Sequence, residues 1–194
     1  GSDAAACVGR SPHKDNVQLW EEKMGLVLPA DISDKEYVRY GTEAEKYLRG
    51  LFALDFPEYQ VLYDENNMFL NPNFPWMHAS LDGELMDRQG RHGILEIKTT
   101  NILQSSQRRN WEGRIPDNYF CQVLHYLAVT EWDFVVLRAQ LKSQRAGTLL
   151  IETRDYIIER EDVEADIQCL VEAERSFWEH VQSGRRPNLI LPAI

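Results

Sequence analysis

The chain has 194 residues, of which 43% are hydrophobic and 27% are charged, with a formal net charge of −10. This length and balance are typical of one globular domain with a full core, so we expect a single domain over residues 1–194. The negative charge argues against a protein that coats nucleic acid through a basic surface. The negative charge is compatible with a local basic groove. Nucleic-acid binding in the absence of metal should, however, be weak and salt-sensitive.

No apolar run approaches membrane-spanning length and no signal peptide is visible, so we expect a cytoplasmic protein. The three cysteines, Cys7, Cys121 and Cys169, are far apart and form no Cys-x-x-Cys pair. This spacing argues against a zinc site, a disulfide framework or an iron–sulfur cluster. The chain begins with Gly1 instead of methionine, so we expect that the N-terminus is trimmed or that Gly1 is a cloning remnant.

The first segment predicts short helices joined by polar turns. Ser2-Asp3 precedes three alanines, which is the pattern of a helix N-cap. A second short helix is predicted over residues 16–25, capped by Asp15 or Asn16 and ended by Gly25. Polar turns that contain Arg10 and Lys14 lie between the two.

A longer amphipathic helix is predicted from Ser33 or Asp34 to about Leu54. Glu45 lies on its apolar stripe, whereas Glu43 lies on the solvent side. An ionised carboxylate on an apolar stripe needs a partner, so Glu45 belongs either to a salt bridge or to a functional site. The apolar positions of the stripe are Tyr37, Tyr40, Ala44, Leu48, Leu51 and Phe52.

Residues 76–100 predict two strands joined by a polar turn at residues 87–93. Asp82 shares one face of the first strand with His78 and Ser80, and Glu96 shares one face of the second with Lys98. A turn centred near Gln89 and Gly90 places Asp82 opposite Glu96. Two carboxylates and one amine then converge on one patch.

This patch has the groups that phosphodiester hydrolysis needs. Mg²⁺ prefers one or two carboxylates together with waters and substrate oxygens. We expect Asp82 and Glu96 as ligands, with the backbone carbonyl of Ile97 between them. Lys98 would hold or polarise the attacking water and offset the charge on the phosphate. The alternative is that these residues decorate a solvated sheet face.

The polar segment at residues 104–114 contains Arg108, Arg109 and Trp111. Cations beside an aromatic ring suit a phosphate backbone and an exposed base. A solvated segment with a packed tryptophan fits the pattern equally well.

The remaining elements complete an α/β pattern. A helix is predicted over residues 115–129, with Gln122 on a polar row between Tyr119 and Tyr126. We expect a central mixed sheet flanked by helices. The other predicted elements are a strand at residues 58–64, a loop at 66–75, strands at 134–141 and 148–158 around a turn at 142–147, a long helix at 160–182 packed over the sheet, and an apolar tail at 187–194.

Asp82 followed by Glu96-Ile97-Lys98 resembles the PD-(D/E)xK nuclease core, with Leu81 in place of the usual proline. More narrowly, the chain resembles the YqaJ and lambda-exonuclease family of phage recombination exonucleases, as far as about Thr130. The segments that carry this resemblance are Gly-Ser-Asp-Ala-Ala-Ala at residues 1–6, Gly-Thr-Glu-Ala-Glu at 41–45, Ala-Ser-Leu-Asp-Gly at 79–83 continuing to Lys98, and Tyr-Phe-Cys-Gln-Val-Leu-His-Tyr at 119–126.

The resemblance implies a restriction-endonuclease-like core and an Mg²⁺-dependent exonuclease, with Mn²⁺ as a substitute ion. Such an enzyme degrades one strand of linear double-stranded DNA, 5′ to 3′, in homologous recombination. It also implies a homotrimeric ring around the DNA and a single-strand annealing protein as partner. The roles that it implies are a place near the metal ions for Glu45, orientation of the attacking water or the lysine by Gln122, and 5′-phosphate contacts by Ser2 and Ser80, with added charge from Arg10 or Lys14.

Two alternatives stay open at this point. A PD-(D/E)xK endonuclease of the restriction or repair type would also cut circular DNA, whereas an exonuclease needs an end. A non-catalytic module that binds DNA ends or a protein could have kept the same fold, although the intact set of Asp82, Glu96, Lys98 and Gln122 argues against it.

Overall fold

The structure is a computed structural model that describes residues 1–191. The last three residues of the predicted apolar tail at 187–194 lie outside this range. None of the helices in the described range is both long and apolar enough to cross a membrane. The helices are α1 Ala4–Cys7, α2 Asn16–Lys23, α3 Glu36–Asp55, α4 Ser105–Arg109, α5 Asp117–Thr130 and α6 Arg160–Ser183. The strands are β1 Gln60–Leu62, β2 Phe69–Leu70, β3 His78–Ala79, β4 Gly83–Met86, β5 His92–Ile102, β6 Phe134–Arg145 and β7 Thr148–Glu159.

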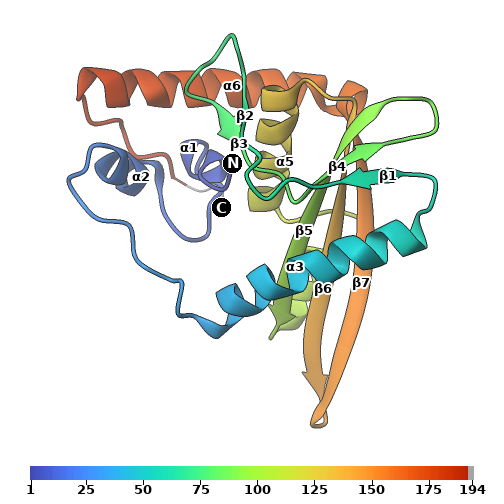
Figure 1. The fold of residues 1–194 in the computed structure, drawn as a ribbon. Coiled ribbons are helices and arrows are strands. Elements are labelled where there is room, and N and C mark those ends of the chain that lie inside the picture. Colours follow the sequence, from blue (N-terminus) through green and yellow to red (C-terminus); the bar gives the residue numbers. More distant parts are fainter. Residues whose placement is uncertain (192–194) are drawn as a thin grey trace.

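The central sheet has the strand order β1-β4-β5-β6-β7 (Figure 1). Its pairs are antiparallel except β5 and β6, which run parallel. A parallel pair needs a crossover, and here the crossover contains α4 and α5. The predicted mixed sheet flanked by helices is therefore confirmed.

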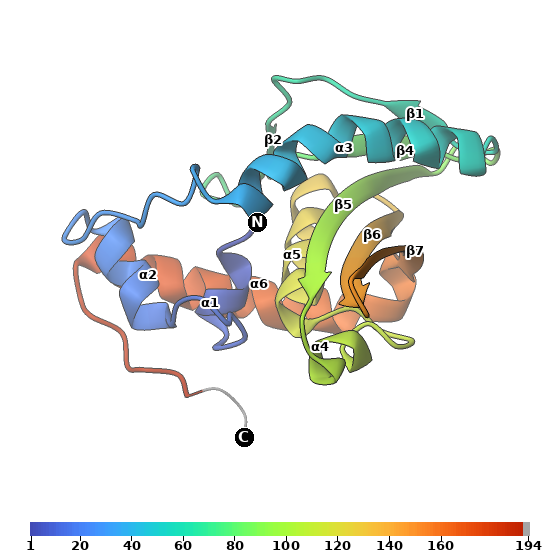
Figure 2. The same cartoon turned by 90° about the horizontal axis from the view of Figure 1, so that it is seen from below.

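Helices cover both faces of this sheet. On one face, Leu48 and Phe52 of α3 pack against a buried cluster that includes Leu95 and Val136. On the other face, α5 packs against a larger core that includes Leu137. Figure 2 shows α3 and α5 on opposite sides of β5.

The long helix α6 packs over the sheet only in part, against β7. Its main contacts are with α5, across which it runs (Figure 1). The reason is that α5 already covers this sheet face and is buried around its whole circumference from Cys121 to Val129. The apolar stripe of α6 therefore meets helices, including α1 and α2.

The cap predicted for α2 is confirmed, whereas Asp3 ahead of α1 makes no side-chain capping hydrogen bond. Asp15 caps α2, because its carboxylate accepts from the amide of Gln18 while the side chain of Gln18 accepts from the amide of Asp15. This reciprocal pair is a capping box. Gly25 follows the helix with a φ of 71°, a left-handed conformation that glycine adopts without strain.

The strand predicted ahead of the turn is divided. Its first part, β3, contains only His78 and Ala79 and pairs with β2, which lies in the predicted loop; its second part is β4. The chain folds back between them because Asn71 accepts hydrogen bonds from the amides of Asn73 and Phe74. Such a side chain supplies the turn that the backbone needs. Asp82 then lies in a bend directly before β4.

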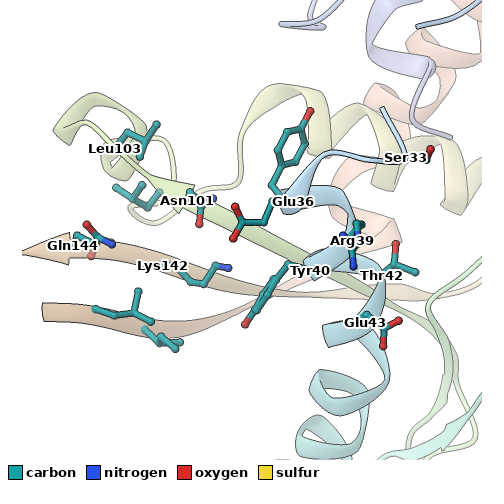
Figure 3. Close-up of a pocket in the computed structure, with 15 residues that line it drawn as sticks. Ser33, Glu36, Arg39, Tyr40, Thr42, Glu43, Asn101, Leu103, Lys142 and Gln144 are labelled. Carbon is teal, nitrogen blue, oxygen red and sulfur yellow. The ribbon is translucent and has the colours of Figure 1, made fainter. Parts of the chain in front are cut away.

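The predicted apolar stripe of α3 is only half right. Leu48 and Phe52 are buried, whereas Tyr37 is 57% exposed and Leu51 50% exposed. The first turns of α3 extend past the packed part of the sheet and line an open groove of about 1170 Å³ with the ends of β5, β6 and β7 (Figure 3). The stripe therefore continues beyond the core that it was expected to cover.

A pair of neighbouring substitutions tests this register of α3. We expect Phe52→Ala to lower the free energy of unfolding by about 3–5 kcal/mol, because it empties a fully buried site. Leu51→Ala should change it by less than about 0.5 kcal/mol. Chemical denaturation measures both values, and equal losses would contradict the register.

Candidate active site

The candidate site lies where β4 begins beside the longer β5 (Figure 1). The register pairs Gly83 with Leu95, so Asp82, one residue before Gly83, comes opposite Glu96, one residue after Leu95. This is the arrangement that the turn spacing predicts. The register therefore brings both carboxylates to the edge of β5 that β4 leaves uncovered.

Asp82 is tied directly to β5. Its Oδ2 atom accepts a hydrogen bond from the amide of Ile97 at 2.8 Å. The N–H and C=O of one residue in an antiparallel pair point to the same neighbour. The carbonyl of Ile97 thus faces the Asp82 side of the strand, where it could serve as the predicted metal ligand.

Glu96 is 1% exposed. Its Oε1 atom lies 2.5 Å from Nζ of Lys98, and its buried Oε2 atom has no hydrogen-bond partner among the described residues. A buried carboxylate oxygen without a partner is unfavourable. A cation bound beside Asp82 would satisfy it.

Charges and burial shift the ionisation of this cluster. Burial raises the pKa of Asp82 well above its usual range, and the Glu96 carboxylate raises it further. Burial alone would lower the pKa of Lys98, but the carboxylates of Glu96 and Asp82 more than offset this, and the pKa is raised. Lys98 is therefore a cation held by the two carboxylates, whereas the ionised form of Asp82 is disfavoured.

Helix α3 contributes Glu45 and Arg49. Oε1 of Glu45 lies 2.9 Å from Nη1 of Arg49, and the same Nη1 donates to the carbonyl of Asp82. The side chain of Glu45 is 28% exposed against 78% for Glu43, in agreement with the predicted preference for Glu45. Arg49 was not predicted as a site residue, although its i,i+4 spacing from Glu45 is a signal for the pair.

Helix α5 forms the opposite wall. The side-chain amide of Gln122 donates to the hydroxyl of Tyr126 at 2.7 Å, and both residues are buried. Burial raises the pKa of Tyr126, and the Glu96 carboxylate adds to this. Nζ of Lys98 lies 5.2 Å from the ring centre of Tyr119. The predicted polar row therefore faces the carboxylates. Gln122 was predicted as a site residue, whereas Tyr126 was not.

The donor set fits a hard divalent cation that keeps several waters. Among residues 1–191, no three side chains of histidine, cysteine, aspartate or glutamate are close enough to hold a metal ion alone. Mg²⁺ needs only one or two carboxylates besides waters and substrate oxygens. This need would be met by Asp82, Glu96 and the carbonyl of Ile97. Glu45 is close to them and forms an ion pair with Arg49.

The predicted 5′-phosphate contacts are placed as follows. Ser80 is exposed two residues before Asp82. Ser2 is exposed ahead of α1, next to Gly1, which packs against the ring of Tyr126. Ser80 is therefore close to Asp82 along the chain, and Ser2 follows a residue that contacts the α5 side of the site.

The basic side chains that were predicted to contact DNA differ in whether they are already paired within the chain. Arg10, Lys14 and Arg108 all form ion pairs within the chain, whereas Arg109 is exposed at the end of α4. Only Arg109 of this set combines exposure with a place in the predicted segment. The ion pairs are Arg10 with Asp117 at 3.1 Å, Lys14 with Glu22 at 2.6 Å and Arg108 with Glu152 at 2.6 Å.

The prediction that Trp111 contacts DNA is wrong. The residue is 2% exposed, and its ring lies 5.6 Å from that of Tyr119 and 6.0 Å from that of Tyr156. Its carbonyl also accepts a hydrogen bond from Arg154 at 2.6 Å. The indole belongs to the core and cannot stack on a base.

This sheet, with an aspartate before β4 and a Glu-x-Lys pair on β5, has the arrangement expected of a PD-(D/E)xK core, and solved exonuclease structures share its fold. The alkaline exonuclease LHK-Exo from Laribacter hongkongensis matches with a TM-score of 0.64 at 16% identity, over 95% of this chain and 90% of that one. A phage-related exonuclease from Haemophilus somnus 129PT matches with a TM-score of 0.61 at 15% identity, over 94% of both chains. At these identities the likeness shows the fold.

The sequence places the chain within this class. The family model described as the YqaJ-like viral recombinase domain matches residues 1–133, and the chain belongs to that family. It is also 28% identical to the uncharacterized protein YqaJ of Bacillus subtilis (strain 168), over 97% of this chain and 55% of that protein. The chain therefore spans about half the length of this curated relative.

The raised pKa of Asp82 generates a test of stability. In the unfolded chain the carboxyl of Asp82 has a pKa of about 3.9. The metal-free fold therefore loses stability as the pH rises above that value, because the carboxyl must then ionise in the folded protein. Asp82→Asn keeps an oxygen for the amide of Ile97 and removes the charge. We expect it to stabilise the metal-free protein by on the order of 1 kcal/mol at neutral pH, and to match the wild type near pH 4.

Thermal unfolding between about pH 4 and pH 8 measures this difference over the titration window. Asp166→Asn is the matched control, because Asp166 is exposed on α6. If Asp82→Asn and Asp166→Asn show the same pH dependence, Asp82 does not carry the proposed cost.

Proposed function

We propose that this chain is the nuclease domain of a metal-dependent exonuclease that degrades one strand of linear double-stranded DNA. The observation that carries the proposal is the unpartnered Oε2 atom of Glu96, buried beside Asp82 and Lys98. A chain that used this cluster only for stability would leave that oxygen paired. A site that binds a cation and a phosphate needs it free.

Each group then has a chemical role. Asp82, Glu96 and the carbonyl of Ile97 would hold Mg²⁺, or Mn²⁺ as a substitute. When bound, such an ion lowers the pKa of a coordinated water and neutralises phosphate charge. The ammonium of Lys98 holds the attacking water and donates to a phosphate oxygen as negative charge builds. The Gln122–Tyr126 pair orients Lys98 or the water from the α5 side.

Further features extend the proposal to the substrate. Ser2 and Ser80 would hold a 5′-phosphate, which gives digestion from 5′ to 3′ and leaves a single-stranded 3′ tail. The family description as a viral recombinase domain supports a role in phage-type homologous recombination in the cytoplasm, with a single-strand annealing protein as partner. A trimeric ring would keep the enzyme on its DNA.

The amine of Lys98 should be essential for cleavage. We expect Lys98→Ala to reduce Mg²⁺-dependent nucleotide release from linear duplex DNA by about 10²–10³-fold, because it removes a donor to the developing charge. Lys46→Ala, on the exposed side of α3, is the matched control and should retain full activity. Acid-soluble release from labelled DNA measures both.

The same assay separates the kinds of nuclease. An exonuclease of this type should act faster on a 5′-phosphorylated end than on a 5′-hydroxyl end and should leave a closed circle intact. Cutting of the circle would indicate an endonuclease. No cleavage by the folded protein with any divalent ion would leave a binding module and overturn the proposal.

The exposed guanidinium of Arg109 should contact the DNA backbone. We expect Arg109→Ala to weaken binding equally for different sequences and to reduce the slope of log affinity against log salt by about 1, as for the loss of one phosphate contact. Arg88→Ala, at the exposed turn before β5, is the control. Fluorescence anisotropy at several salt concentrations gives the slope, and an unchanged slope would exclude this contact.

A further inference from the structure

The segment that ends in Asp82 lies between two strand ladders. The β2–β3 ladder ends at Ala79, and the β4–β5 ladder begins at Gly83. Residues 80–82 therefore stand outside the hydrogen-bond ladders that fix their neighbours on both sides. A metal ligand in such a segment needs another source of rigidity, because small displacements weaken a site.

Asn67 holds this segment from one side. Its Oδ1 atom accepts from the amide of Leu81 at 2.8 Å, and its Nδ2 atom donates to the carbonyl of Leu81 at 3.0 Å. The side-chain amide thus makes the two hydrogen bonds that a neighbouring strand would make. Nδ2 also donates to the carbonyl of Asp64 at 2.6 Å, which anchors Asn67 itself.

His125 and Glu174 hold strand β3, directly ahead of this segment. Nε2 of His125 lies 3.0 Å from the carbonyl oxygen of His78, and because a carbonyl only accepts, Nε2 carries the proton. Nδ1 lies 2.9 and 3.0 Å from the two carboxylate oxygens of Glu174. Both side chains are buried, so this pair fixes the imidazole ring, which links α5 to α6 and to β3.

We propose that Asn67 and the His125–Glu174 pair are positioning residues for Asp82. They fix the backbone at Leu81 and at His78 and thereby set where the Asp82 carboxylate meets β5. Glu174 lies on α6, outside the residues that the family model matches, so the C-terminal helix takes part in the site. The proposal rests on the proposed function only in taking Asp82 as a metal ligand.

One amide reports the position of Asp82 without metal or DNA. The amide of Ile97 donates to the carboxylate of Asp82 and loses its partner if Asp82 moves. The amide of Leu137, a residue in the middle of β6 with a neighbouring strand on each side, reports general loosening of the sheet. Hydrogen exchange at these two amides therefore separates a positioning role from a merely structural one.

The chain offers matched pairs of variants. Asn67→Ala removes one clamp, and Asn66→Ala, at an exposed neighbour, is its control. Glu174→Gln weakens the other clamp while leaving an oxygen for Nδ1, and Glu172→Gln, exposed on the same helix, is its control. Arg49 is left intact, because it also pairs with Glu45.

We expect Asn67→Ala and Glu174→Gln to speed exchange at Ile97 by about tenfold, as for the loss of one hydrogen bond, without the same change at Leu137. We also expect the Kd for Mn²⁺, measured by electron paramagnetic resonance of the free ion, to rise about 10–100-fold, as when groups behind metal ligands are removed. Both control variants should behave as the wild type.

Unchanged exchange at Ile97 in the two clamp variants would overturn the proposal. Equal acceleration at Ile97 and Leu137 would also overturn it, since the clamps would then only stabilise the fold. Failure of the proposed function gives a different result, because a wild-type chain that binds no Mn²⁺ still shows whether Ile97 exchange depends on the clamps.

Discussion

The site depends on one mismatch in length between neighbouring strands. β4 begins at Gly83, whereas β5 continues to Ile102, so the edge of β5 beyond Leu95 lacks a strand partner on that side. The amide of Ile97 is satisfied there by Asp82, and Glu96 and Lys98 occupy the same stretch of strand. An uncovered edge inside a sheet is otherwise a liability. Here it provides the polar opening into a buried site.

The apolar core around the site must offset the free-energy cost of this opening. Burying Asp82 and Glu96 with one lysine opposes folding, so apolar contacts must offset it. Phe52 and Leu48 of α3 supply them on one face of β5, and Val123 and Leu127 of α5 supply them on the other. The two helices that bring Glu45 and Gln122 to the site are thus also the helices that stabilise the strand between them.

The sequence predicted what depends on spacing along the chain. The turn length sets Asp82 opposite Glu96, and the helical period places Glu45 rather than Glu43 toward the site, because both rules are local. Whether Trp111 and the outer half of α3 are buried or exposed depends instead on where the sheet ends. Arg49, Asn67 and Glu174 act through contacts with segments between 14 and 49 residues away in sequence, and no periodic pattern encodes such contacts.

Charge gives the last constraint on how this chain could hold DNA. Its 31 acidic residues outnumber 21 basic ones, and Arg10, Lys14 and Arg108 are already paired with carboxylates of the same chain. Contacts to a phosphate backbone would therefore depend on cations outside these pairs, among them Arg109, and binding through such contacts weakens as the salt concentration rises. If the chain is the proposed exonuclease, copies joined in a ring would add to these contacts, since linked contacts raise the effective concentration of each. The proposed ring would then hold the duplex by topology while each site releases its product, and a net negative charge on each copy would be compatible with continued digestion.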